Sequence, residues 1–338
     1  MILRLCPKKY KYVYWSLNSA MIQTTIYDQY EVGLQQQILK VFHASGLKLH
    51  DNYFGNKIYN NYQRLALMVL FVRSRKALRN FVSELKESKW VSWLGLREIP
   101  TKSSLQRWIK KFDLQTLRRL LSQTVANQQP SLMAIDATGI DSFQRSSHYE
   151  KRLKDFGFRN PPSPYAKAEV LVDTDKKLVY DFVLRVKPRH DTLGAKTMFK
   201  RLKQKEVLIL ADKGYDCEEL HELLASSGNQ FYAPVRDFKV KKPKGYHRRR
   251  CMQGHKLYNQ RNLVESTIRS LKVRIRNLRS KLHYMKKREF AWHIIAYNLE
   301  KLSQSINALF KLLNKATIWD KASKPIDLKR IVNFITLK

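Results

Sequence analysis

Residues 168–186 read AEVLVDTDKKLVYDFVLRV, in which two apolar runs flank a short charged segment. The runs Ala168–Val172 and Leu178–Val186 are rich in β-branched and aromatic residues, as strands are. The segment Asp173–Lys177 between them has the composition of a turn. This stretch therefore predicts two neighbouring strands joined by a turn, and it makes a β-sheet the centre of the fold.

Further strands and helices are expected on either side of this hairpin. Short buried runs predict strands over 132–135, 207–211 and 231–235. The apolar residues have helical spacing in three segments, which are 191–203, 217–227 (ended by Gly228) and 262–282. A meander of three strands followed by alternating helices and strands predicts an α/β domain, with a mixed sheet and flanking helices.

The chain before residue 129 is expected to be helical. The run 62–85 has apolar residues at helical spacing, and a new helix is predicted after Pro100, with Ser103 and Gln106 as its capping box. An inward-facing stripe follows, made of Leu105, Trp108, Ile109 and Phe112. A long helix is also expected over 287–313. The predicted domains are a helical domain, an α/β domain and a tail, over residues 1–128, 129–313 and 314–338.

The charge of the chain indicates its partner. Lys and Arg number 65 and Asp and Glu 28, which gives a formal net charge of +37. Such an imbalance repels itself in the folded state, and nucleic acid is the polyanion that best offsets it. A membrane surface is the second choice, but we find no apolar stretch of membrane-spanning length. The cysteines are few and scattered, which favours a reducing compartment and a cytoplasmic protein.

The helix predicted after Pro100 is one candidate for DNA contact. Arg107, Lys110 and Lys111 fall outside its apolar stripe, and a short turn containing Gly95 and Pro100 precedes it. Two helices joined in this way, the second of them basic, are typical of a helix-turn-helix. An ordinary helical hairpin with a solvated basic face explains the same pattern, and the sequence leaves the two interpretations open.

Two aspartates follow predicted buried strands in a chain that has few acids. Asp136 comes after the run 132–135, and Asp212 comes after 207–211. Side chains at the carboxyl ends of strands project into the crevice where ligands bind. Carboxylates at such positions suit hard divalent cations, although each aspartate could instead form a turn or cap a helix. Asp141 and Asp216 are the nearest competitors for the two positions.

A glutamate joins these aspartates as a candidate. If 258–272 formed one α-helix, Tyr258, Arg261, Glu265 and Lys272 would lie within an arc of about 60°, with Arg269 and Arg276 beside them. The adjoining stripe is apolar and consists of Val264, Ile268, Leu271, Ile275 and Leu278. One carboxylate in a row of cations suits a metal ion beside phosphates. An Arg261–Glu265 salt bridge on a solvated face is the plainer alternative.

These residues resemble a known family. Asp136, Asp212 and Glu265 look like the DDE triad of insertion-sequence transposases. Tyr258, Arg261, Glu265 and Lys272 match the YREK signature of one transposase group at every offset. Weaker likenesses cover three segments, Ala211–Asp216, Ile58–Phe112 and Ala296–Leu299. The interval between Asp212 and Glu265 is too short for a large inserted sheet, so the five-type branch of the group is favoured over the four-type.

The resemblance implies a fold, an activity and partners. It implies a ribonuclease-H-like fold. It also implies a transposase that binds its element's ends, cuts them with metal-activated water and uses the freed 3′ hydroxyl to attack target DNA. Asp136, Asp212 and Glu265 would hold two Mg²⁺ ions (Mn²⁺ possible), and Tyr258, Arg261 and Lys272 would position phosphates. The implied partners are the terminal inverted repeats, target DNA and a second copy of the chain in the synaptic complex. A DNA-binding regulator without the chemistry is the alternative.

A strongly basic run, 239–256, is a further candidate for backbone contact. It contains no acid, and its cations repel one another, so contact with DNA phosphates explains them better than a solvated loop does. The residues singled out are Lys241, Lys242, Arg248, Arg249 and Arg250. A zinc site at His247, Cys251 and His255 is disfavoured because a fourth ligand is missing. His190 and Asp191 precede a helix and are interpreted as a cap.

Overall fold

The computed structural model describes residues 26–51, 57–142, 152, 155–156, 165–186, 189–236 and 243–320, with side chains from 30 to 304 within these ranges. The chain forms two compact units: one is Ile38–Asn298, and the other combines the described residues of Met1–Gln37 and Leu299–Lys338. No helix among the described residues is long and apolar enough to cross a membrane. The three-domain division expected from the sequence remains a proposal.

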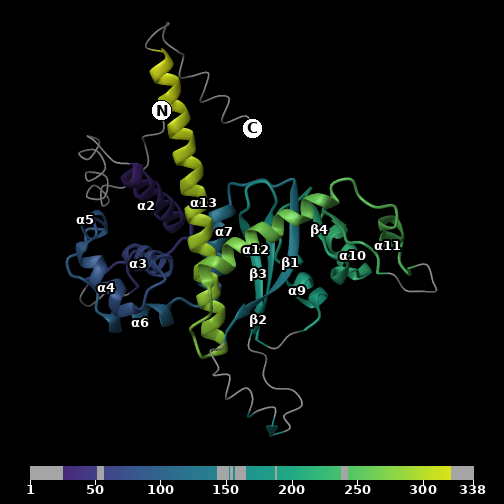
Figure 1. Cartoon of the computed structure of the whole chain (residues 1–338), viewed down its shortest axis with the longest axis horizontal. Helices are drawn as coiled ribbons and strands as arrows, with labels where there is room; N and C mark the ends of the chain where they lie inside the picture. The colour runs from purple at the N-terminus through teal and green to yellow at the C-terminus, as the bar shows by residue number, and fades with distance from the viewer. Residues whose placement is uncertain are drawn as a thin grey trace. The chain divides into compact units, whose positions relative to one another are not determined.

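The sheet has five strands within the described residues (Figure 1). They are β1 (Leu132–Asp141), β2 (Tyr165–Asp173), β3 (Val179–Arg185), β4 (Leu208–Ala211) and β5 (Gln230–Tyr232). Their order is β3-β2-β1-β4-β5. The β1–β2 and β2–β3 pairs are antiparallel, whereas β1–β4 and β4–β5 are parallel. The mixed α/β sheet of ribonuclease-H-like type predicted from the sequence is confirmed, including the meander.

Asp173 stabilises the turn between β2 and β3. One oxygen of its carboxylate accepts the backbone N–H groups of Asp175 at 2.9 Å and Lys176 at 3.2 Å. Lys177 then adopts a left-handed backbone with a φ of 56° and closes the turn. An aspartate that bonds the backbone ahead of it stabilises a turn locally. The predicted turn at 173–177 therefore forms for the expected reason.

Helices pack on the sheet (Figure 1), and those in contact with its strands include α9 (Asp191–Phe199), α10 (Glu218–Ser226) and α12 (Asn262–Ile275). Two more helices belong to this part of the chain: α11 (Tyr246–Cys251), which contacts α10, and the long α13 (His283–Asp320). The strand register places Asp136, Val170 and Phe182 on one face and Glu169 on the other. Phe290 of α13 packs on Phe182, with ring centroids 5.2 Å apart. The side chain of Glu169 lies directly against Gly194 of α9, where there is no room for a Cβ atom.

The N-terminal region is helical, as predicted. Its helices are α2 (Ile26–Ala44), α3 (Asn61–Ser74), α4 (Leu78–Glu87), α5 (Trp90–Trp93), α6 (Lys102–Lys111) and α7 (Leu114–Val125). Leu105, Trp108 and Phe112 are buried, so the inward stripe of α6 is largely confirmed. The helix α7 packs against β3.

Two predicted features of this region are wrong. The run 62–85 is not one helix, because Arg75 has a left-handed backbone with φ of 57° and separates α3 from α4. The cap of α6 is Thr101 rather than Ser103: the Thr101 side chain accepts the N–H of Ser104 at 3.2 Å. A capping box does form at the start of α3, between Asn60 and Gln63.

Element ends also differ in the α/β region. The strand β1 continues to Asp141 because it pairs with β2 along its whole length, so Asp136 does not end a strand. Residues 258–261 form the 3₁₀ helix η3 rather than the first turn of an α-helix. The helix α12 stops at Ile275, ahead of the predicted residue 282, where Arg276 takes a φ of 53°. The apolar stripe of α12 is nevertheless buried as predicted, at Val264, Ile268, Leu271 and Ile275.

Candidate active site

Asp136 and Asp212 lie side by side in the sheet. The parallel pairing of β1 with β4 ends at Ile135 opposite Ala211, and the next residue of each chain segment is the aspartate. Asp136 accepts the N–H of Ala137 at 2.8 Å, and Asp212 accepts the N–H of Lys213 at 2.7 Å. The register of two neighbouring parallel strands therefore fixes the two carboxylates at one edge of the β1–β4 pair.

Glu265 lies on α12 and is connected to Asp136 by Arg261, which contacts both carboxylates. The Arg261 guanidinium donates to the Glu265 carboxylate at 2.8 Å and lies 3.8 Å from that of Asp136. Its side chain is 15% exposed, whereas that of Glu265 is 56% exposed. The salt bridge expected as the plainer alternative is present, but it is not confined to a solvated face. Arg261 links the glutamate of α12 to the first aspartate of the sheet.

The charges of the other two acids act on Asp136. Burial raises the pKa of Asp136, and the negative charges of Glu265 and Asp212 raise it further. The N–H of Ala137 and the charge of Arg261 act in the opposite direction. The strand register places Asp212 next to Asp136, and the contacts of Arg261 connect Asp136 to Glu265.

Tyr258 belongs to the same site, but by a different route from the one predicted. It lies on η3, so the helical projection that placed it on the face of α12 is wrong. Its ring packs edge-on against Tyr232 at 5.4 Å. Burial raises the pKa of Tyr258, Arg261 lowers it, and the charges of Asp212 and Asp136 raise it. Lys272 and Arg269 are exposed on α12.

The donor set fits a hard divalent cation better than zinc. Three carboxylates contribute oxygen only, which Mg²⁺ and Mn²⁺ prefer. Within the described ranges, no three His, Cys, Asp or Glu side chains already surround one point closely enough to hold a metal. Arg261 instead lies between Asp136 and Glu265. Asp136 and Glu265, two of the residues that would hold a cation, both lie beside this guanidinium, which balances part of their charge.

The competing acids have other roles. Asp216 accepts two hydrogen bonds from Arg248, both 2.6 Å long, and a third from the N–H of Arg236 at 3.0 Å. Asp141 is exposed at the far end of β1. Arg248, predicted from the sequence to contact DNA, thus has its guanidinium bound to Asp216. Its contact with DNA stays a prediction.

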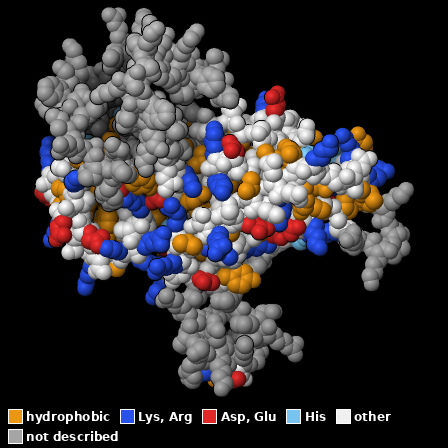
Figure 2. Space-filling view, turned by 45° about the horizontal axis from the view of Figure 1, so that its top comes forward, with side chains coloured by type: hydrophobic (Ala, Val, Ile, Leu, Met, Phe, Trp, Pro, Cys, Tyr) orange, Lys and Arg blue, Asp and Glu red, His pale blue; other side chains and the backbone are white. Residues whose placement is uncertain are grey.

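The remaining basic candidates are partly described. Lys241 and Lys242 lie outside the described residues, whereas Arg249 and Arg250 are exposed on α11. Arg107, Lys110 and Lys111 are exposed on α6, where Lys111 also forms an ion pair with Asp51. Figure 2 shows many Lys and Arg side chains on the face turned to the viewer, and fewer acids.

The neighbourhood of the disfavoured zinc site is a packed cluster. Cys251 is buried, and its Sγ lies 3.9 Å from Nε2 of His221. Burial lowers the pKa of His221 to about 4. His190 caps α9 by accepting the N–H of Thr192, as predicted for a cap.

Two buried polar groups of the α/β region, the Tyr215 hydroxyl and the Glu169 carboxyl, were not identified from the sequence. The Tyr215 hydroxyl is buried without a hydrogen-bond partner among the described residues, and burial raises its pKa well above the usual value, as do the charges of Glu169, Asp191, Asp136 and Asp212. Burial raises the pKa of Glu169, which is fully buried, to about 7. A buried acid inside an apolar strand was the signal that could have identified Glu169.

A family match and a structural likeness relate this chain to known proteins. No curated protein matches the chain. Among solved structures, the cryo-EM structure of a piggyBac transposase synaptic complex with hairpin DNA is similar at a TM-score of 0.38, with 12% identity over 90% of this chain and 82% of that chain. The family described as "Transposase DDE domain" matches residues 127–299, just over half of the chain and all five strands. This protein therefore belongs to the DDE transposase family.

Proposed function

We propose that this protein is the transposase of an insertion sequence, which binds the ends of its element and catalyses metal-dependent DNA cleavage and strand transfer. The observation that carries the proposal is that Asp136 and Asp212 each directly follow the last pair of the β1–β4 register. Arg261 connects Asp136 to Glu265. Its membership of the YREK group and of the five-type branch is part of the same proposal.

The chain's own residues divide the work. Asp136, Asp212 and Glu265 would hold two Mg²⁺ ions, with Mn²⁺ as a substitute. Such ions, when bound, activate a water or a 3′ hydroxyl and stabilise the leaving oxygen. Arg261 already neutralises part of the acidic charge, and its remaining N–H donors can bind a phosphate oxygen. Arg261 is close enough to Tyr258 to lower its pKa, so the two can position one phosphate together, with Lys272 and Arg269 binding further along α12.

The DNA contacts outside the site are also proposals. The exposed cations of α6 would contact the element end, in keeping with a helix-turn-helix, and those of α11 would contact its backbone. Lys241 and Lys242 would extend the latter surface. A homodimer would bring two element ends together for strand transfer.

The test uses DNA from both sides of the gene that encodes this chain. Duplexes with the inverted repeats are incubated with the full chain and Mg²⁺, and strand breaks are mapped. We expect breaks at the repeat ends, their loss when EDTA is added and their return with excess Mg²⁺. Tight binding of the repeats without cleavage in Mg²⁺ or Mn²⁺ would contradict the proposal and would favour a regulator.

A further inference from the structure

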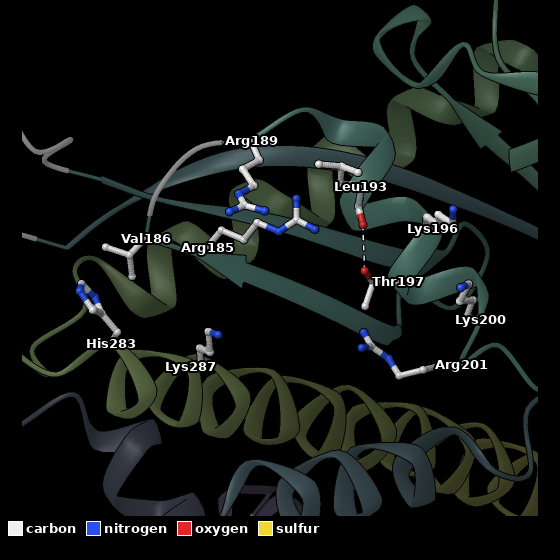
Figure 3. A pocket seen from close by; sticks show the side chains of 10 residues that line it. All are labelled: Arg185, Val186, Arg189, Leu193, Lys196, Thr197, Lys200, Arg201, His283 and Lys287. Atoms are coloured by element: carbon white, nitrogen blue, oxygen red, sulfur yellow. Dashed lines mark hydrogen bonds between the residues drawn. The ribbon is translucent and has the colours of Figure 1, made fainter. Parts of the chain in front are cut away.

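A basic hollow lies beside the sheet, and none of the three acids lines it. It has a volume of about 790 Å³ and is shown in Figure 3. Six Lys or Arg side chains and one histidine line it, and none of its ten lining residues is acidic. The cations come from three elements or their ends: Arg185 ends β3, Arg189 precedes α9, Lys196 is on α9, Lys200 and Arg201 directly follow it, and Lys287 is on α13.

The hollow continues into a second one on the side of α7. Both are lined by Lys200 and Arg201, so they meet at the end of α9. The second hollow has a volume of about 1160 Å³ and adds four cations, Arg118, Arg119, Lys203 and Lys205, but only two acids, Asp181 and Glu206. We call the two together the α9 groove. It follows the outer strand of the sheet, β3.

Protein acids neutralise only part of this charge. Asp181 pairs with Arg201 at 2.7 Å and with Arg118 at 3.3 Å, and the buried Glu169 lies 3.8 Å from Arg185. Lys196 pairs with Glu219. The described residues form no ion pair with the six other cations, which are Arg119, Arg189, Lys200, Lys203, Lys205 and Lys287. Unpaired like charges held close together repel one another, and a polyanion relieves that repulsion.

The groove begins next to the candidate active site. The start of α9 packs against the 3₁₀ helix η2 (Lys213–Tyr215), which directly follows Asp212. Arg236 connects the two segments: its guanidinium donates to the Gly214 carbonyl at 2.5 Å and lies 3.2 Å from Nε2 of His190. Arg189 is the residue before His190. A strand leaving Asp212 can therefore enter the groove at Arg189.

We propose that the α9 groove binds the phosphate backbone of the DNA that extends from the cleavage position. The proposal rests on the proposed function, because it takes the DNA to be held at Asp136 and Asp212. A continuous row of cations from α7 to α13 suits a long polyanion better than one small anion. The cations could instead protect the open edge of β3 from pairing with another chain, as lysines do on edge strands.

The test removes two unpaired cations from opposite sides of the groove. The variant is Lys200→Gln/Lys287→Gln, and the matched control is Lys48→Gln/Lys86→Gln, which removes the same charge from exposed positions outside the groove. Binding is measured between 50 and 200 mM salt with two element-end duplexes, one ending just past the cleavage position and one about 20 base pairs longer. Cleavage of the short duplex is measured in the same samples.

On the long duplex, the groove variant should reduce the slope of log affinity against log salt by about 2. The parent should therefore lose roughly tenfold more affinity than the variant across this salt range. The control should keep the parent's slope, and on the short duplex all three proteins should bind alike. An unchanged slope, or an equal change in the control, would overturn the groove proposal, as would self-association of the groove variant without weaker binding.

The cleavage readout separates this proposal from the proposed function. If the parent cleaves the short duplex but the groove variant keeps the parent's slope, the groove proposal fails and the transposase proposal stands. If the slope falls as expected but the parent never cleaves, the groove is supported as a DNA-binding surface and the catalytic proposal fails.

Discussion

The candidate active site and the α9 groove are clusters of opposite charge on the same sheet. The first places Asp136 and Glu265 beside a single guanidinium, with Asp212 next to Asp136. Among the described residues, the second gathers ten Lys and Arg side chains, and the acids that line it are Asp181 and Glu206. In a chain with 65 basic and 28 acidic residues, cations gather by chance more easily than acids do. The acidic cluster is therefore the more informative of the two.

The two clusters also differ in how they are held. The backbone register of β1 and β4 fixes the aspartates, and hydrogen bonds to the next N–H orient both carboxylates. The groove cations are mostly exposed ends of long side chains. A fixed arrangement suits chemistry, where small misplacements are costly, whereas mobile cations suit a polyanion that is bound by charge alone. We infer that the first cluster determines rate and the second affinity.

Apart from changes to the acids themselves, the largest effect is expected at Lys272 of α12. Lys272→Ala should slow metal-dependent cleavage by up to ~100-fold, because a misplaced scissile phosphate reacts slowly. It should also lower the salt slope by about 1 and leave the melting temperature unchanged, because the Lys272 side chain is exposed. Lys281→Ala, at another exposed lysine, is the control. Normal cleavage with an unchanged slope would show that the YREK spacing is a coincidence.

A stability effect is expected where the groove's strand is anchored. The buried Asn298 amide donates to the Val179 carbonyl and to the Thr124 hydroxyl, both at 2.8 Å, and its oxygen accepts the Val179 N–H at 3.0 Å. Asn298→Ala leaves these groups without partners and should lower the free energy of unfolding by roughly 2–4 kcal/mol. Urea denaturation measures this, with the exposed Asn259→Ala as control. An equal stability for both variants would mean that water replaces the amide.

The smallest effect is expected at Glu169 of β2, whose carboxylate lies 3.8 Å from Arg185 of the α9 groove. Its pKa is raised from 4.5 to about 7 in the folded chain, so the unfolded chain loses this proton first. The carboxyl's contribution to stability is thus present below pH 4.5 and is lost as the pH rises to about 7.

Glu169→Gln removes this titration. The stability of the variant relative to the parent should therefore rise between pH 4.5 and 7 and stay level above it. The change should be roughly 1–3 kcal/mol, measured by urea denaturation across that range. A relative stability independent of pH would show that Arg185 keeps the carboxylate ionised throughout.

The sequence predicted those features that local patterns encode. The hairpin turn at Asp173, the succession of strands and helices along the chain and the buried stripe of α12 follow from composition and spacing over a few residues. The position of Asp136 could be predicted because buried strands have a recognisable composition, but the continuation of β1 could not, since it depends on pairing with β2. The break at Arg75 and the 3₁₀ turn at Tyr258 depend on backbone conformations that these residue types do not signal.

Features built from distant segments could not be predicted. The assignment of Arg248 to DNA missed Asp216, which is 32 positions away in the chain. The α9 groove combines side chains from α7, β3, α9 and α13, and none of these segments is unusual by itself. Glu169 was not singled out from the sequence, and its burial depends on the packing of β2 against Gly194 of α9. The family resemblance reached the acidic site because its motif fixes spacings, which a charge-only surface does not have.

The central claim is that Asp136 serves the chemistry and not the fold. The direct measurement is Mg²⁺-dependent cleavage of element-end DNA by Asp136→Asn, compared with Asp141→Asn, which changes an exposed aspartate on the same strand. Binding of the same DNA is measured beside it. We expect Asp136→Asn to bind normally and to cleave no faster than background, and Asp141→Asn to behave like the parent. Cleavage at the parent's rate by Asp136→Asn would contradict the claim.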